Sequence, residues 1–320
     1  MRIAKTAYVQ SKAFFMCLNV RKMSYTLDDY KRLEASPRTQ AYKQALKRVY
    51  ESDNDAILLD LGTGSVMCFS KIGEKLGFKT CVAIEKCTNA YNHAKRYYLP
   101  KFKNTTTLEN MDVLDLTTKH FQSFVDKRFV VVHEFFDNLA SAENAHILLE
   151  HVSQIFSSLG ISASYVPCAA STTITLTHMS FDTIKKIQCE DPRLFVPFCM
   201  IDTGIDCIDH IEDMCAECPQ HILEKIDFVN GTHECPVVNI NDACKHIVFR
   251  LCIHFDEKDY TISDGDTWQH LVLSCDNIMF PLQLQLEVKG YSEDHPIYAL
   301  HLNKECIELS NMRSWSHLND

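Results

Sequence analysis

A short glycine turn after an apolar run is the feature that most constrains the fold of this chain. Residues 56–59 are apolar, and Asp60, Gly62 and Gly64 follow at alternate positions. The chain has only 9 glycines in 320 residues, well below the usual share of about 7 %, so this close pair points to a backbone requirement. Without side chains, the backbone there turns tightly and lets a ligand approach closely. The pattern predicts a strand, a turn and a helix.

Two further apolar runs follow in the first half of the chain. Residues 80–84 end at Glu85, and residues 129–132 end at His133 and Glu134. Helical spacing of apolar residues predicts helices over residues 24–50, after Gly64 to about residue 76, after Glu85 to about residue 98, and over residues 141–158. This alternation of strands and helices predicts an α/β fold with a doubly wound parallel sheet.

The second half of the chain has a different rhythm. Apolar and polar residues alternate with period two over residues 172–177, 246–253, 282–288 and 297–302, which is typical of half-buried antiparallel strands. We therefore expect three parts: an N-terminal helical segment over residues 1–50, an α/β domain over 51–165, and a β-rich domain over 166–320.

Glu85 gives the glycine turn a chemical meaning. It lies 21 residues after Gly64, at the end of the next predicted strand, where nucleotide-binding folds place the acid that binds ribose hydroxyls. Val66 occupies the position of the third glycine that dinucleotide folds use. The pattern therefore favours a nucleoside with a compact tail, such as S-adenosylmethionine, over a dinucleotide. The alternative is a turn that only packs a helix on the sheet.

A second carboxylate follows the third apolar run. Glu134 comes at its end, where ligands of doubly wound sheets bind, and Glu143 lies nine residues later in a predicted loop. Two close carboxylates repel each other unless a cation lies between them. A guanidinium satisfies both, because its nitrogens donate paired hydrogen bonds to carboxylate oxygens. The alternative is two solvated acids that flank a loop.

These two glutamates resemble the double-E loop of the protein arginine methyltransferases, which has the same nine-residue spacing, and Glu134-Phe135-Phe136-Asp137 is most similar to its monomethylating branch. The resemblance runs from about Arg38 to the C-terminus. It implies a Rossmann-like class I methyltransferase domain followed by a β-barrel domain. It also implies methyl transfer from S-adenosylmethionine to protein arginine, with Glu134 and Glu143 as the catalytic pair and no metal.

The same resemblance assigns a cofactor role to six positions. The resemblance implies that an arginine holds the cofactor's carboxylate and that a glycine loop holds its nucleoside. It also implies that one acid binds the ribose and another contacts the adenine. The matching residues here are Arg38, Asp60, Gly62, Gly64, Glu85 and Asp112.

In the second half, Trp268 lies in a segment that resembles the family's Thr-His-Trp loop and is the implied substrate-binding residue. The family forms dimers through a helical arm, which we expect within residues 179–205. The expected partners are a second copy or a paralogue, and a protein substrate with arginine-rich segments.

Three positions depart from the family pattern: Val66 for the third glycine, Thr267 for the loop histidine, and Ala35 for the aspartate that pairs with it. They leave open an alternative, a catalytically inactive subunit that regulates or stabilises a paralogous methyltransferase.

Charge and cysteine content bear on the partners, the compartment and the metal binding of this protein. The net charge of −10 suits basic partners and disfavours direct nucleic-acid binding. The 15 cysteines have no framework spacing, as expected of free thiols in a reducing compartment, so we expect a cytoplasmic or nuclear protein without a membrane span. A zinc site formed by Cys207, His210, Cys215, Cys218 and His221 is a further alternative.

Overall fold

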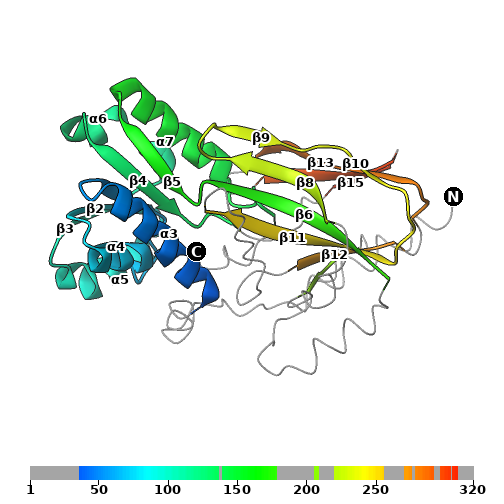
Figure 1. Cartoon of the computed structure of the whole chain (residues 1–320), viewed down its shortest axis with the longest axis horizontal. Coiled ribbons are helices and arrows are strands. Elements are labelled where there is room, and N and C mark those ends of the chain that lie inside the picture. The colour runs from blue at the N-terminus through cyan, green and yellow to red at the C-terminus, as the bar shows by residue number, and fades with distance from the viewer. Residues whose placement is uncertain are drawn as a thin grey trace.

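The structure is a computed structural model that describes residues 36–136, 139–178, 205–208, 220–255, 270–275, 278–291, 296–303 and 305–308. An α/β half and a β-rich half follow one another along the long axis of the molecule (Figure 1). The change occurs between β5 (Ser162–Val166) and β6 (Ala169–Thr177).

The α/β half is built on a parallel sheet with the order β3-β2-β1-β4-β5. Its other strands are β1 (Ile57–Leu61), β2 (Thr80–Glu85), β3 (Thr105–Asn110) and β4 (Arg128–His133). All five residues of β1 are buried, because a central parallel strand is covered on both faces. The doubly wound sheet predicted from the apolar runs is confirmed.

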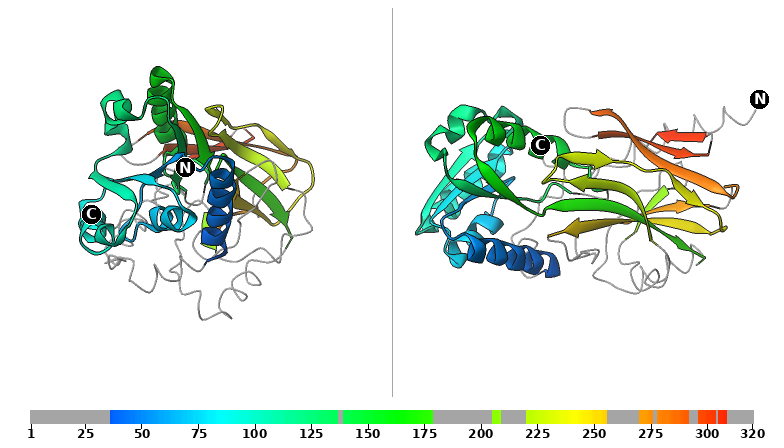
Figure 2. Two further views of the ribbon diagram at one scale, coloured as in Figure 1. Left: turned by 60° about the vertical axis from the view of Figure 1, so that its left-hand side comes forward. Right: turned by 45° about the horizontal axis from the view of Figure 1, so that its top comes forward.

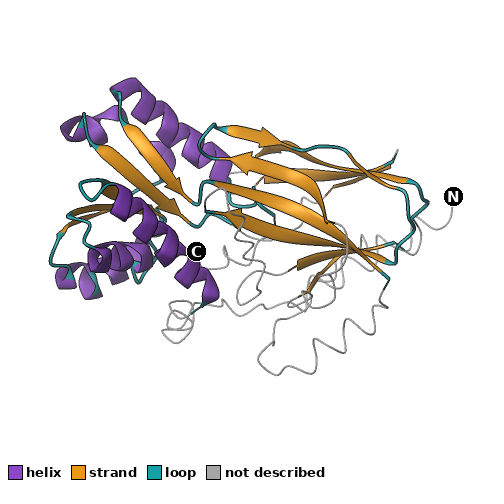
Figure 3. Cartoon of the chain, viewed as in Figure 1, coloured by secondary structure: helices purple, strands orange, loops and turns teal. Residues whose placement is uncertain are grey.

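Helices pack on this sheet, as the two views of Figure 2 and the colours of Figure 3 show. They are α3 (Pro37–Ser52), α4 (Cys68–Leu76), α5 (Thr88–Tyr97), α6 (Thr118–Phe121) and α7 (Ala145–Leu159). Single 3-10 turns lie at η1 (Leu99–Lys101), η2 (Val113–Asp115) and η3 (Gln122–Phe124).

Three details differ from the sequence predictions. Helix α3 begins at Pro37, because Ser36 caps it through the Thr39 N–H and is held extended before proline. Residues 24–35 of the predicted helix lie outside the described residues. Helix α7 begins at Ala145, after two turns and a left-handed Asn144. Strand β3 was not predicted, because it is an edge strand in which only Leu108 is buried.

The β-rich half is antiparallel, as predicted. Its six-stranded sheet has the order β7-β12-β11-β6-β8-β9, and its four-stranded sheet the order β10-β13-β14-β15. The bounds are β7 (Ile205–Ile208), β8 (Gln220–Asp227), β9 (Thr232–Glu234), β10 (Val238–Ile240), β11 (His246–His254), β12 (His270–Ser274), β13 (Leu282–Tyr291), β14 (Pro296–Leu302) and β15 (Glu305–Glu308). Closure of these sheets into a barrel stays a prediction.

The two halves share a core. The cluster of buried residues around the parallel sheet includes Ile226 and Phe228 from β8 and its end, and Phe255 after β11. Tyr42 of α3 packs edge-on against Phe255, with ring centroids 4.8 Å apart. The predicted domain bounds stay a prediction. No helix within the described residues has the length and apolar character needed to cross a membrane.

Candidate functional site

Asp60 anchors the turn that leaves β1. Its carboxyl is fully buried, and Oδ2 accepts hydrogen bonds from Thr63 Oγ1 at 2.6 Å and from Ser70 N and Oγ at 2.9 and 2.6 Å. Oδ1 is also buried and has no hydrogen-bond partner among the residues that the structure describes. Burial raises the pKa of Asp60, against the opposing effect of the bonds from Ser70 and Thr63.

Both glycines of the turn need their glycine backbone. Gly62 and Gly64 have φ values of 69° and 67°, in the left-handed region that glycine adopts without strain. A Cβ on Gly62 would lie 2.7 Å from Cε1 of Phe135, whereas one on Gly64 would meet nothing within 4 Å. The turn is therefore closed by the Phe135 ring at its first glycine and open at its second.

Val66, which the sequence suggested as a weak point, is buried in the turn. The left-handed backbone lies one residue later, at Met67, where φ is 52° and ψ is 51°. Val66 itself is not among the residues with positive φ. Val66 therefore has no conformational need for glycine, and the strain of the turn falls on a fully buried methionine instead.

Glu85, at the end of β2, is tied to the glycine turn. Oε2 accepts the Gly64 N–H at 2.8 Å, and Oε1 accepts the Cys87 N–H at 2.8 Å. Each carboxylate oxygen has a second lone pair, so two further hydrogen bonds can be accepted. Burial raises the pKa of Glu85, although both backbone bonds oppose that rise.

Asp112 lies next to this edge, after β3. Oδ1 accepts the Leu114 N–H at 3.0 Å and thereby caps η2, while Oδ2 pairs with Lys86 Nζ at 3.0 Å. Asp60 thus lies near the end of β1, Glu85 at the end of β2 and Asp112 just after β3. Open α/β sheets bind ligands at this edge.

Glu134 and Arg38, which the sequence assigned to substrate and cofactor, form an ion pair with each other. Arg38 Nη1 lies 2.6 Å from Glu134 Oε1. The Arg38 side chain is 9 % exposed and that of Glu134 is 25 % exposed, so the pair is largely withdrawn from water. Burial raises the pKa of Glu134 despite the opposing charge of Arg38.

His133, the last residue of β4, directly precedes Glu134 in the chain. Its imidazole is fully buried, and neither ring nitrogen has a hydrogen-bond partner within the described part of the chain. The rings of Phe135, Phe136 and Phe228 surround it, at centroid distances of 5.6, 5.3 and 4.8 Å. This apolar setting lowers the pKa of His133 to about 3. The sequence analysis missed this residue.

The loop after Glu134 contacts the β-rich half. The Ala140 N–H bonds to Thr172 Oγ1 at 2.9 Å, and Ser141 Oγ lies 2.6 Å from Tyr298 Oη. Glu143 is half-buried in the same loop. Its pairing with Glu134 stays a prediction.

Other predicted features fall on residues outside the described part of the chain: Trp268, Thr267, Ala35, most of the arm at 179–205, and His210, Cys215 and Cys218 of the zinc alternative. A different cluster of possible metal ligands, Glu224, His233 and Cys235, lies within the described residues, and no motif in the sequence predicted it.

No family model matches the chain, and no curated protein matches its sequence. Solved structures do match. The structure of PRMT6 has a TM-score of 0.60 and 10% sequence identity, over 85% of this chain and 97% of that chain. Protein arginine methyltransferase 10 of Arabidopsis thaliana has a TM-score of 0.57 and 13% identity, over 90% and 95%.

The PRMT1 enzyme-prozyme heterotetrameric complex of Trypanosoma brucei, solved with AdoHcy, also matches. It has a TM-score of 0.51 and 12% identity, over 87% of this chain and 96% of that one. These matches span both halves, and the sheet order and the change to antiparallel strands agree with them. The chain thus has the fold of the protein arginine methyltransferases.

Proposed function

We propose that this protein is an S-adenosylmethionine-dependent methyltransferase that methylates arginine side chains of proteins. The observation that carries the proposal is the state of Glu134. Its carboxylate lies at the ligand-binding edge of the sheet and already binds a guanidinium, that of Arg38, at 2.6 Å. Glu134 is partly exposed, so its second oxygen can accept from the guanidinium of a substrate.

The turn after β1 fits the nucleoside part of the cofactor. Asp60 Oδ1 is a buried acceptor without a partner among the described residues, and the space beside Gly64 is open. Glu85 retains lone pairs for two ribose hydroxyls. The complex from Trypanosoma brucei was solved with AdoHcy, which is the product that remains after methyl transfer. In this proposal Arg38 binds the cofactor's carboxylate and Asp112 lies near its adenine.

S-adenosylmethionine supplies a methyl group on a sulfonium. A guanidinium nitrogen of the substrate would form a bond to that methyl carbon as the sulfur–carbon bond breaks, which would leave S-adenosylhomocysteine, and the proton of the nitrogen would pass to solvent. Glu134, with Glu143, accepts hydrogen bonds from the nitrogens that do not react and so keeps positive charge on them. Fixing the nitrogen in line with the methyl group contributes up to about 7–11 kcal/mol.

The test is methyl transfer by Glu134→Gln. We expect the variant to bind S-adenosylhomocysteine as the wild type does and to transfer no radiolabelled methyl group to an Arg/Gly-rich peptide. The matched control is Glu150→Gln, which makes the same change on the exposed face of α7. Near-wild-type transfer by Glu134→Gln would contradict the proposed role.

A second function, that of a non-catalytic subunit paired with an active paralogue, is favoured by one observation. Arg38 pairs with Glu134, and the Phe135 ring lies against Gly62. Side chains of the chain itself therefore contact both the proposed substrate end and the proposed cofactor end of the site, as they would in a subunit that binds neither ligand. The complex from Trypanosoma brucei is named as an enzyme-prozyme assembly. The discriminating assay measures transfer by this chain alone, by the paralogue alone, and by the two together. Transfer by this chain alone supports the first function.

A further inference from the structure

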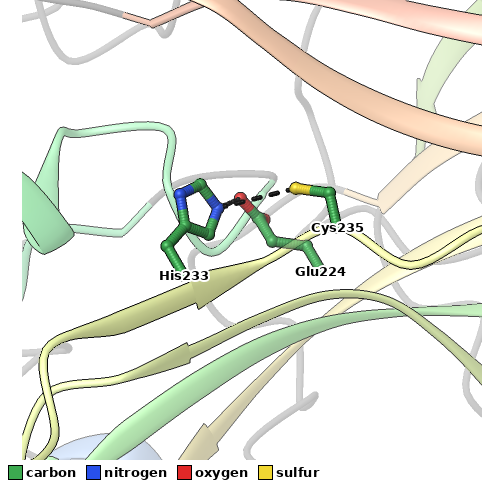
Figure 4. Close-up of side chains that lie close together, drawn as sticks. All are labelled: Glu224, His233 and Cys235. Carbon is green, nitrogen blue, oxygen red and sulfur yellow. Dashed lines mark hydrogen bonds and ion pairs between the residues drawn. The ribbon is translucent and has the colours of Figure 1, made fainter.

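Three side chains with different donor atoms meet in the hairpin formed by β8 and β9. Glu224 lies on β8, His233 on β9, and Cys235 just after β9. His233 Nε2 is 2.9 Å from Glu224 Oε1 and 3.7 Å from Cys235 Sγ, and the three ligand atoms lie within 4.8 Å of one another. Figure 4 shows the imidazole, the carboxylate and the thiol pointing toward one another.

The register of the hairpin explains why they meet. His233 pairs with Ile226 across the two strands. Glu224 is two residues from Ile226, and Cys235 is two residues from His233. Because side chains alternate between the two faces of a sheet, all of these positions fall on one face. The convergence is therefore built into the strand pairing.

A metal ion satisfies this group better than hydrogen bonds do. One imidazole nitrogen faces both the carboxylate and the sulfur, and a single N–H aligns well with only one acceptor. In tetrahedral zinc sites, nitrogen and sulfur ligands lie about 3.5 Å apart and nitrogen and oxygen ligands about 3.3 Å apart. The observed 3.7 and 2.9 Å differ from this by a few tenths of an ångström.

The surroundings of Glu224 also suit a cation. Its carboxyl is fully buried, and Oε2 accepts a hydrogen bond from Thr172 Oγ1 at 2.8 Å. A buried carboxylate requires a compensating positive group, and that group is needed on the Oε1 side, which faces His233 and Cys235.

Solvent reaches the cluster. A cavity of about 430 Å³ between α7 and the β8–β9 hairpin is lined by His233 and by His146. The two imidazole rings lie 4.4 Å apart, centroid to centroid. An ion can enter through this cavity, and a water molecule that enters with it would complete a fourth position.

We propose that Glu224, His233 and Cys235 form a zinc-binding site at the junction of the two halves of the molecule. Thiolate and imidazole ligands select Zn²⁺ over Mg²⁺ and Ca²⁺, which prefer oxygen ligands. Binding displaces the thiol proton of Cys235 to solvent and moves the His233 proton to Nδ1, which leaves Nε2 free to ligate. The carboxylate and thiolate then neutralise the two positive charges of the ion.

The site is expected to be structural. It would fasten β8 to the segment after β9, and Ser141 of the loop that follows β4 bonds to the same carboxylate. Metal binding to a folded site stabilises the protein by linkage. The proposal does not rest on methyltransferase activity, so it is tested without an activity assay.

The experiment is a metal titration of the full-length chain after dialysis against metal-free buffer. Zinc is measured by plasma mass spectrometry, and Co²⁺ is used as a spectroscopic probe because a thiolate ligand gives a charge-transfer band in the near ultraviolet. We expect about one Zn²⁺ per chain, a rise in Tm with added zinc, and the Co²⁺ band. Cys235→Ser should abolish the band and weaken zinc binding at least tenfold.

Two control variants separate this site from surface binding. Cys306→Ser removes an exposed thiol elsewhere. His301→Asn removes an imidazole that pairs with Glu287 at 2.6 Å. Both should bind zinc as the wild type does, whereas His233→Asn should not. If His233→Asn fails to fold, Cys235→Ser and the Co²⁺ spectrum decide.

Three outcomes would overturn the proposal: no stoichiometric zinc in the wild type, unchanged binding by Cys235→Ser, or an equal loss on Cys306→Ser.

Discussion

His133 makes the stability of this fold depend on pH in a direction and by an amount that can be worked out. The imidazole is fully buried among three phenylalanine rings, and burial lowers its pKa to about 3. In the unfolded chain its pKa is about 6.5. Below pH 6.5 the unfolded chain therefore binds a proton that the folded chain does not, so this residue makes the free energy of unfolding fall as the pH falls.

The size of the effect follows from the two pKa values. Between pH 6.5 and 3, each pH unit removes about 1.4 kcal/mol of stability. From pH 7 to pH 5 the loss is about 2 kcal/mol, which is a large part of the 5–15 kcal/mol of a typical domain.

His133→Leu isolates this contribution. Leucine has a similar volume and leaves no polar atom behind, and neither ring nitrogen of His133 has a partner among the described residues, so at pH 7 we expect a change below about 1.5 kcal/mol. Urea unfolding at pH 7 and at pH 5 measures how much free energy of unfolding each protein loses between these two pH values. Other groups titrate in both proteins, so the wild type should lose about 2 kcal/mol more than the variant. Equal losses would refute the reasoning.

Four further substitutions probe the site. Gly62→Ala should destabilise the protein by more than the roughly 1–2 kcal/mol of left-handed strain, because the new Cβ would meet Phe135. Gly64→Ala should cost only that strain, because the space beside Gly64 is open. Urea unfolding of both variants measures the two losses. Tyr42→Phe removes the hydrogen bond to the His133 carbonyl, 2.9 Å away, and should cost about 1–3 kcal/mol, so an unchanged Tm would contradict that bond. Glu85→Ala should weaken S-adenosylhomocysteine binding at least tenfold by calorimetry, and an unchanged affinity would rule out the nucleoside assignment.

Local sequence rules predicted the backbone of β1, its turn and β2 well, because the parts of this edge are local. A buried run, two glycines and an acid at the end of the next run determine β1, its turn and β2, and Gly62 and Gly64 have the positive φ values that the pattern implies. Val66 shows what such a pattern leaves out. The sequence marks Val66 as the position of the missing third glycine, but the left-handed residue of this turn is Met67, and only the observed dihedral angles reveal that.

Contacts between distant segments could not be predicted in the same way. Glu224 and His233 are nine residues apart in an unremarkable stretch of sequence, and only the register of β8 and β9 brings them and Cys235 to one face. Phe135 was noticed as part of a resemblance, whereas its position against Gly62 depends on the path of the loop after β4. His133 had the sequence position of a site residue but the environment of a core residue.

Helix α3 links these observations, because its first turns hold Glu134 in two ways. Arg38 binds the Glu134 side chain, and one turn later Tyr42 donates its hydroxyl hydrogen bond to the carbonyl of His133, the residue before Glu134. Tyr42 is itself buried against Phe69 of α4 and Phe255 of the β-rich half. The direction of the Glu134 carboxylate is therefore set by a helix that packs on both halves of the molecule, so the proposed clamp for a substrate guanidinium requires that α3 be docked.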